Sequence, residues 1–281
     1  MKASKTVAVL GPQGTFSHHA AQSYFGHSPM YYGKNLVDVF GAIISKQADF
    51  GVVPIENSTN GTVGQTLDLL VEYNDHLRIV GEVFVPVEHC VAVRSSDVSQ
   101  ISRIYSHPQA LDQCARHLLQ RYPHAELLET GSTADAMRKV TFSNEGGIAA
   151  IGPAFCAAFY GLRIIEHRMQ DADNNYTIFF IIGTDMNPQE NADRTTICVD
   201  VSDRRDKPGT LVSLLKPIAD LDINLSYIQS RPAGAARHAY RFFFTLDGPP
   251  ESDDIRLAIR YAKQIADIKT LGSYKSAQVE T

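Results

Sequence analysis

Hydroxyl and amide side chains gather in five segments of the sequence, each where a predicted strand gives way to a predicted helix. The five segments span residues 11–17, 54–62, 106–109, 131–133 and 151–153. Backbone N–H groups at the start of a helix, with the positive end of the helix dipole behind them, bind anions such as carboxylates. A single segment of this kind could simply supply a helix cap, as Ser17, Thr62 and Ser132 are predicted to do. Five of them in one α/β region indicate a binding site, because the strands of such a region tend to end at a common crevice.

Strong acids and bases are few in these segments. Glu56 and His107 are their only strongly titratable residues, and neither a Ser-His-Asp order nor a pair of carboxylates is evident. Gly11–Gly14 is not followed by Gly-Lys-Ser/Thr, which excludes a nucleotide-binding P-loop. A site of Thr, Ser, Asn and Gln suits a substrate whose own instability drives its reaction, because the protein then needs only to hold anions and hydrogen-bond a leaving hydroxyl. We expect Glu56 to organise residues 57–61, and His107 either to act chemically or to lie beside a helix cap.

The composition limits the partners and the compartment. A net charge of −5, with no cluster of Lys and Arg among aromatic residues, argues against nucleic acid and acidic membranes as partners. No apolar run approaches the roughly 18 residues of a membrane helix, and Met1–Leu10 is too short for a signal peptide. The four cysteines and ten histidines show no metal-ligand spacing. We therefore expect reduced, mostly buried thiols, no metal and a cytoplasmic location.

Alternating strands and helices must position these segments. The predicted strands cover residues 6–10, 50–55, 77–87, 89–94, 103–106, 147–151 and 174–183. The predicted helices cover residues 17–25 after a Ser cap, 63–73 capped by Thr62, 108–121, 132–142 capped by Ser132, and 153–160 stopped by Gly161. This order predicts an α/β region.

A polar segment, Thr184–Arg194, has no apolar period and predicts a linker. Beyond it the predicted strands are 195–201, 223–230, 238–247 and 271–278, and the predicted helices are 208–220 and 253–268. The order βαββαβ is the ferredoxin-like plan. The sequence thus predicts two domains, 1–190 and 191–281.

Eight blocks of this sequence resemble the motifs of a known family. GPQGTFSHHAA (11–21), GVVPIENSTNGTV (51–63), SHPQALDQC (106–114), GSTADA (131–136) and AAIGPAFCAAFYGL (149–162) resemble, in order and spacing, the signature blocks of prephenate dehydratases. PGTL (208–211) and INLSYIQSRP (223–232) resemble the two motifs with which ACT domains bind phenylalanine, and LGSY (271–274) also matches. The resemblance implies a dehydratase domain of two lobes, like a type II periplasmic binding protein, followed by an ACT domain. The lobes would comprise about 1–83 plus 172–190, and 84–171, with the site in the cleft between them.

The implied reaction converts prephenate to phenylpyruvate, with loss of CO2 and the ring hydroxyl, in L-phenylalanine biosynthesis. It is a carbon–oxygen lyase reaction that needs no cofactor, because aromatisation drives it. Thr177 would donate to the departing hydroxyl, although a Thr in a strand also has a purely structural explanation. The implied substrate-binding residues are Thr15, Ser17, Asn57, Ser58, Thr62, His107, Gln109, Ser132, Thr133, Asn175 and Phe179. The implied binding residues for L-phenylalanine as effector are Gly209, Thr210, Leu211, Asn224, Leu225 and Ser230. ACT domains usually pair across subunits, so the resemblance also implies a homodimer or homotetramer.

The sequence departs from the family pattern at two positions. The catalytic motif Asn-x-Thr-Arg-Phe here ends in Thr177-Ile178-Phe179, and the ACT motif Glu-Ser-Arg-Pro here begins with Gln229. An Arg beside Thr177 would give a substrate carboxylate a bidentate partner. Ile178 therefore predicts a compensating group, either a helix N-terminus at Ser17 or Ser132 or a cation. The candidate cations are His107, Arg94 and Arg163. Two alternatives stay open, an arogenate dehydratase and a non-catalytic sensor of phenylalanine or prephenate.

Overall fold

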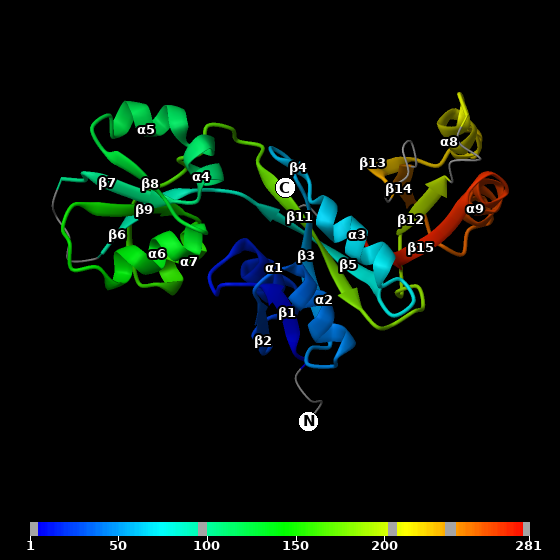
Figure 1. The fold of residues 1–281 in the computed structure, drawn as a ribbon, viewed down its shortest axis with the longest axis horizontal. Coiled ribbons are helices and arrows are strands. Elements are labelled where there is room, and N and C mark those ends of the chain that lie inside the picture. Colours follow the sequence, from blue (N-terminus) through cyan, green and yellow to red (C-terminus); the bar gives the residue numbers. More distant parts are fainter. Residues whose placement is uncertain (1–4, 95–99, 202–206, 234–239, 278–281) are drawn as a thin grey trace.

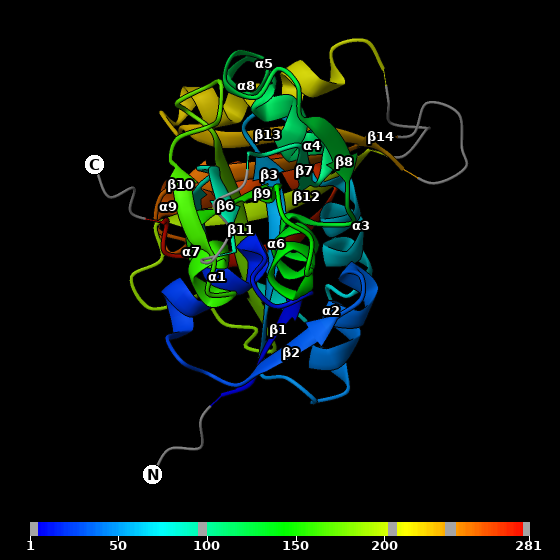
Figure 2. The same ribbon diagram turned by 90° about the vertical axis from the view of Figure 1, so that its left-hand side faces the viewer.

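The computed structural model describes residues 5–94, 100–201, 207–233 and 240–277, whose strands form three sheets (Figure 1). The three sheets, each with its own helices, lie in a row. In Figure 2, which looks along that row, the three parts lie behind one another. We call them the second lobe, the first lobe, which is in the middle, and the C-terminal domain.

The first lobe contains the two ends of the predicted α/β region. Its strands, in sheet order, are β2 (Met30–Gly33), β1 (Val7–Leu10), β3 (Phe50–Asn57), β11 (Tyr176–Gly183) and β5 (Arg78–Pro86), with the short β4 (Gly61–Thr62) paired to β3. Helix α1 (Phe16–Phe25) covers one face of the sheet, while α2 (Leu36–Ile44) and α3 (Gly64–Glu72) cover the other. With both faces covered, consecutive residues of β1 are apolar and buried. Strand β11 runs antiparallel to both of its neighbours.

The second lobe repeats this arrangement with the middle of the chain. Its strands, in sheet order, are β10 (Arg163–Glu166), β6 (Cys90–Val93), β9 (Ile148–Gly152), β7 (Arg103–Ser106) and β8 (Glu126–Glu129). Its helices are α4 (Pro108–Gln113), α5 (Ala115–Arg121), α6 (Thr133–Phe142) and α7 (Ala154–Phe159). Helices α4 and α5 cover one face and α6 and α7 the other.

Two segments cross between the lobes, and they lie side by side. Val87 N donates to Asn175 O (2.8 Å), and Met169 N donates to His89 O (2.8 Å). Two α/β lobes joined by two adjacent crossovers are the architecture of type II periplasmic binding proteins, so the predicted fold class is confirmed.

The C-terminal domain has the predicted βαββαβ order. It comprises β12 (Arg194–Val201), α8 (Thr210–Asp220), β13 (Leu225–Pro232), β14 (Tyr240–Asp247), α9 (Asp253–Ile265) and β15 (Asp267–Tyr274). The sheet order β13-β14-β12-β15 is ferredoxin-like. Both helices cover one face of this sheet. From the other face, Phe243 and Tyr274 join the apolar core of the first lobe, which also contains Ile79 and Phe180. The C-terminal domain is therefore packed directly on the first lobe.

Two of the three predicted helix caps were wrong. Thr15 rather than Ser17 caps α1, because its Oγ1 accepts a hydrogen bond from His18 N (3.4 Å). Thr62 caps nothing, since it lies in β4 and α3 begins at Gly64 without a side-chain cap. Ser132 does cap α6, as predicted.

Other elements also differ from the prediction. The helix predicted over 108–121 breaks at Cys114, and α5 starts afresh because the Asp171 carboxylate accepts hydrogen bonds from Arg116 N and His117 N. The predicted helix 253–268 ends at Ile265, and β15 starts at Asp267. Five elements were missed, namely β2, α2, β4, β8 and β10. Predicted strand ends at His238 and Gln278 lie outside the described residues.

None of the helices in the described ranges has the length and apolar character needed to span a bilayer. All four cysteines are buried and unpaired.

Candidate active site

A cavity of about 350 Å³ lies between the two lobes. Both lobes contribute to its wall, largely through the residues that follow strands and begin helices. The lining residues are Leu10, Gly11, Thr15, Phe16, Ser17, Pro54, Asn57, Val63, Val87, His89, His107, Gln109, Ala110, Gln113, Gly131, Ser132, Thr133, Thr177 and Phe179. Four of the five segments singled out in the sequence meet here, and only 151–153 contributes nothing to the wall.

Most of the predicted substrate-binding residues share this cavity. Those that line it are Thr15, Ser17, Asn57, His107, Gln109, Ser132, Thr133 and Phe179, together with the predicted catalytic residue Thr177. Ser58, Thr62 and Asn175 were predicted to bind substrate, but the structure places them outside the wall. Asn175 and Ser58 lie behind Asn57, because Asn175 Oδ1 accepts from Asn57 Nδ2 (3.1 Å) and from Ser58 Oγ (3.3 Å). Thr62 faces the C-terminal domain instead.

Asn57 holds the Thr177 hydroxyl by donating to its oxygen, which leaves the hydroxyl proton available to a ligand. Its Oγ1 accepts a hydrogen bond from Asn57 Nδ2 (3.0 Å), and the side chain is 9% exposed. Within the described part of the chain, no protein acceptor is placed for the Thr177 hydroxyl proton. Asn57 is itself fixed, since Nδ2 also donates to Tyr176 O (2.9 Å) and Oδ1 accepts from Asn60 N (3.1 Å). The arrangement presents a hydroxyl donor to the cavity.

Two helices begin at the cavity wall. Thr15 caps α1, and Ser132 caps α6 by accepting from Asp135 N (3.0 Å), so the N-terminal ends of both helices face the same space. Neither Lys nor Arg is among the described residues of the wall. An anion here would be stabilised by helix N-termini and neutral donors rather than by a full positive charge.

The wall also contains a pair that the sequence analysis missed, His89 and Gln113. His89 Nε2 lies 3.0 Å from Gln113 Oε1, and burial lowers the pKa of the His89 ring below its ordinary value. Gln113 follows Gln109 by four residues on α4, so both side chains lie on one face. That spacing could have indicated Gln113, whereas nothing in the sequence indicated His89. His107 caps α4 by accepting from Gln109 N (3.3 Å) at Nδ1.

The prediction that residue 178 faces the substrate was wrong. Successive side chains of a strand point to opposite faces, so Ile178 turns away from the cavity that Thr177 and Phe179 line. Its side chain lines a separate cavity of about 90 Å³ against the C-terminal domain, together with Glu56 and Tyr227. The proposed substitutes Arg94 and Arg163 do not line the substrate cavity either. Arg94 instead donates to Ser143 O (2.6 Å).

Strand β13 of the C-terminal domain touches the segment that carries Asn57. Tyr227 donates its hydroxyl proton to Thr62 Oγ1 (3.2 Å), which donates to Gln229 Oε1 (2.8 Å). Thr62 in turn pairs with Glu56 in the β3–β4 hairpin, next to Asn57. Gln229, the second position at which the sequence departs from the family pattern that it resembles, is therefore one hairpin away from the cavity.

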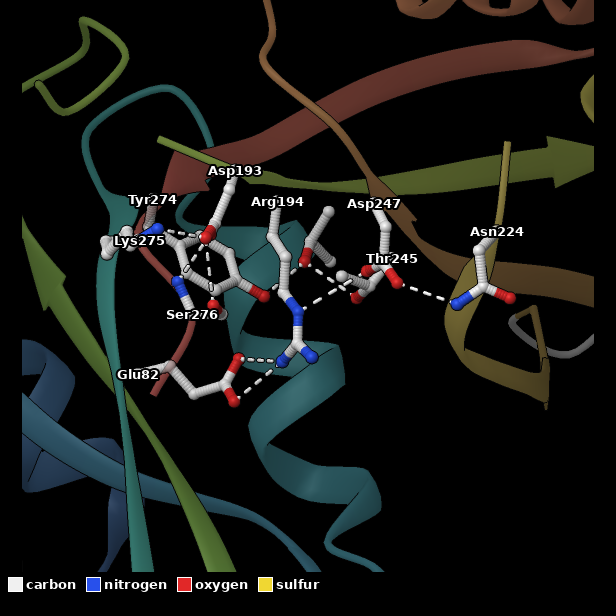
Figure 3. Close-up of polar contacts among 10 residues, drawn as sticks. Glu82, Asp193, Arg194, Asn224, Thr245, Asp247, Tyr274, Lys275 and Ser276 are labelled. Carbon is white, nitrogen blue, oxygen red and sulfur yellow. Dashed lines mark hydrogen bonds and ion pairs between the residues drawn. The ribbon is translucent and has the colours of Figure 1, made fainter. Parts of the chain in front are cut away.

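A chain of ionic contacts forms a second bridge between the C-terminal domain and the first lobe (Figure 3). Arg194 Nη1 donates to both carboxylate oxygens of Glu82 (2.8 and 2.9 Å), and Arg194 Nε lies 3.4 Å from Asp247 Oδ1. Asn224 Nδ2 donates to Asp247 Oδ2 (2.7 Å). Burial raises the pKa of Glu82, and the attraction of Arg194 opposes that rise. The network connects Asn224, a predicted effector residue, to strand β5.

The predicted effector residues are distributed over the two ends of helix α8 and over strand β13. Gly209, Thr210 and Leu211 lie at the N-terminal end of α8, where Gly209 has φ 92°. Asn224 and Leu225 lie just beyond the other end of that helix, about 15 Å away at 1.5 Å per residue. Ser230 is exposed farther along β13.

Comparisons with known proteins agree with this geometry. The family model for prephenate dehydratase matches residues 7–187. A bifunctional chorismate mutase/prephenate dehydratase of Neisseria gonorrhoeae is 35% identical over 275 residues, covering 97% of this chain and 75% of that protein. A solved prephenate dehydratase of Arthrobacter aurescens, in complex with L-Phe, superposes with a TM-score of 0.86 at 30% identity, over 96% of this chain and 89% of that one.

A further solved structure shares the fold alone. It is described as a novel type of quorum-quenching acylase, with a TM-score of 0.87 at 24% identity, over 97% of this chain and 98% of that one. The fold by itself therefore does not fix the reaction. The family match and the lined cavity together are more specific, and the chain belongs to the prephenate dehydratase family.

Proposed function

We propose that this protein converts prephenate to phenylpyruvate as a carbon–oxygen lyase, and that Thr177 protonates the leaving hydroxyl. The observation that carries the proposal is the Thr177 hydroxyl, whose oxygen accepts from Asn57 while its proton has no acceptor among the described residues.

In the proposed step the bond between the ring and its hydroxyl breaks, and the hydroxyl leaves as water with the proton of Thr177. The bond between the ring and its carboxylate breaks in concert, so CO2 departs and the electron pair completes the aromatic ring. Solvent then returns a proton to Thr177. Overall one prephenate dianion and one proton give phenylpyruvate, CO2 and water. The protein contributes orientation and a donor placed where charge develops.

The wall favours prephenate over arogenate. Arogenate carries an ammonium group where prephenate carries a ketone, and a buried ammonium needs an anionic partner. Among the described residues that line the cavity there is no Asp and no Glu. The helix ends at Thr15 and Ser132 suit the two carboxylates of prephenate instead.

We also propose that L-phenylalanine binds the C-terminal domain, an ACT domain, and that the protein is a homodimer or homotetramer. Gly209–Leu211 and Asn224 lie at opposite ends of α8, so a pocket made from both requires a second copy. Strand β13 is at the edge of its sheet and exposes Ile228, which supports pairing there. The contacts of Tyr227 and Gln229 with Thr62 give effector binding a short route to Asn57.

Purified protein incubated with prephenate or arogenate tests the substrate. We expect formation of phenylpyruvate from prephenate and little product from arogenate. The absence of turnover with either compound would refute the proposed enzyme and favour a sensor. For the effector, phenylalanine at about 100 times its Kd should stabilise the folded state by about 2.7 kcal/mol. If the protein sediments as a monomer and phenylalanine does not change its Tm, the proposed effector binding and oligomeric state are refuted.

A further inference from the structure

His89 is fixed from three sides at the point where the chain first crosses between the lobes. Its backbone N donates to Gln170 Oε1 (3.0 Å), and its backbone O accepts from Met169 N (2.8 Å). The edge of its ring meets Phe16 (centroids 6.2 Å apart, planes at 85°), and the residue is 2% exposed. The ring consequently has little freedom to turn, although it lies at the substrate cavity.

The only polar side chain that the His89 ring contacts, within the described residues, is Gln113. His89 Nε2 and Gln113 Oε1 are 3.0 Å apart, while His89 Nδ1 and Gln113 Nε2 are buried without a partner in the described part of the chain. Buried polar atoms are rarely left unpaired, because each unpaired atom costs free energy. The exceptions often have a functional explanation. Gln113 lines the substrate cavity, so its unpaired Nε2 indicates that a ligand completes this amide.

The protonation state of His89 determines which residue donates in the hydrogen bond between His89 and Gln113. Burial favours the uncharged imidazole. A neutral ring carries one proton, and placing it on Nε2 satisfies Gln113 Oε1. The carboxamide of Gln113 is then fixed with its two N–H donors pointing away from His89. Gln109, one turn earlier on α4, lines the same wall.

We propose that His89 is a positioning residue, which holds Gln113 Oε1 so that the Gln113 amide donates to a carboxylate oxygen of the substrate. His89 itself does not touch the substrate. The inference rests on the proposed function, since it takes a dicarboxylate as the ligand.

A double-mutant cycle tests the inference. His89→Phe keeps a ring but removes the donor, and Gln113→Ala removes the group that His89 is proposed to hold. Loss of one neutral hydrogen bond should lower kcat/KM about three- to tenfold, expressed mainly as a higher KM because the carboxylate is bound in both ground and transition states. In the Gln113→Ala background the same substitution at His89 should change kcat/KM less than about twofold. His89→Gln, whose carboxamide can again donate to Gln113, should restore most of the loss.

Two outcomes would overturn the inference. The first is an equal loss of kcat/KM from His89→Phe in the parent and in the Gln113→Ala background, which would show that the ring acts through general packing. The second is a His89→Gln enzyme that has the Tm of the parent but does not recover its kcat/KM. The same cycle is also measured as the Kd for prephenate by calorimetry. If the parent protein has no turnover, the proposed function is refuted, but the Kd values still test the role of His89. If His89→Phe does not fold, His89→Gln and Gln113→Ala alone provide the comparison, and a His89→Gln enzyme with the KM of Gln113→Ala contradicts the inference.

Discussion

Replacing Thr177 by Val should abolish most turnover and leave the fold intact. Val keeps the shape and the strand preference of Thr, so the change removes only the hydroxyl. Asn57 Nδ2 loses one acceptor but keeps Tyr176 O (2.9 Å) and Asn175 Oδ1 (3.1 Å), so no buried donor becomes unpaired. The cost in stability should not exceed about 1 kcal/mol, which lowers Tm by about 2–4 °C in a chain of this size.

The effect on the reaction should be much larger. Deleting one preorganised donor to a developing oxyanion typically lowers kcat by about 100- to 1,000-fold, or about 2.7–4 kcal/mol. The assay follows phenylpyruvate formation from prephenate, with thermal unfolding of the same samples. Thr195→Val is the matched control, because Thr195 is a buried strand residue whose Oγ1 lies 2.9 Å from Ser273 Oγ in the C-terminal domain. A Thr177→Val enzyme with parental turnover, or an equal decline in Thr195→Val, would show that the Thr177 hydroxyl is structural.

The other predictions concern the interface between the first lobe and the C-terminal domain. Burial raises the pKa of Glu56 in the parent protein. Ile178→Arg should pair with Glu56 and raise Tm at pH 7 while changing turnover less than about threefold. The gain in Tm should be lost as pH falls and Glu56 is protonated, because the pairing stabilises only the ionised carboxylate; a large gain in turnover would instead show that residue 178 reaches the substrate. Thr62→Val should weaken the effect of phenylalanine on turnover about tenfold but preserve the Tm shift that phenylalanine produces, and an unchanged effect on turnover would exclude the hairpin as the route. Gly272→Ala should lower Tm and cost about 1–3 kcal/mol, because a Cβ there would lie 2.2 Å from Ile79 O; a parental Tm would show that the domains separate freely.

Local chemistry explains what the sequence predicted well. Thr15, Ser132 and their neighbours could be placed in one cleft because the end of a strand and the start of a helix are both recognisable within a few residues. The ferredoxin-like order of the C-terminal domain followed from its apolar periods alone. Thr177 was different, since only the family motif distinguished it from an ordinary strand residue.

Contacts between distant segments explain most of what was missed. The break between α4 and α5 depends on Asp171, more than fifty residues away, and His89 becomes a site residue only because the crossover brings it to Gln113. The error at Ile178 had another origin. The alternation of β11 already predicts that residues 177 and 178 face opposite sides, whereas the family motif, with its Arg directly after Thr, suggests that both residues face the substrate.

The position of β11 in the sheet has a consequence for how the protein is made. This strand lies between β3 and β5 in the sheet, yet 89 residues of the chain separate the end of β5 from the start of β11. Until β11 has been synthesised, β3 and β5 each have an unpaired edge. Pairing with a strand so distant in the sequence also slows folding. The same strand carries Thr177. A chain still on the ribosome, or cut before Tyr176, therefore has neither a complete first lobe nor the proposed proton donor, and the chemistry becomes available only when the last strand of that sheet is inserted.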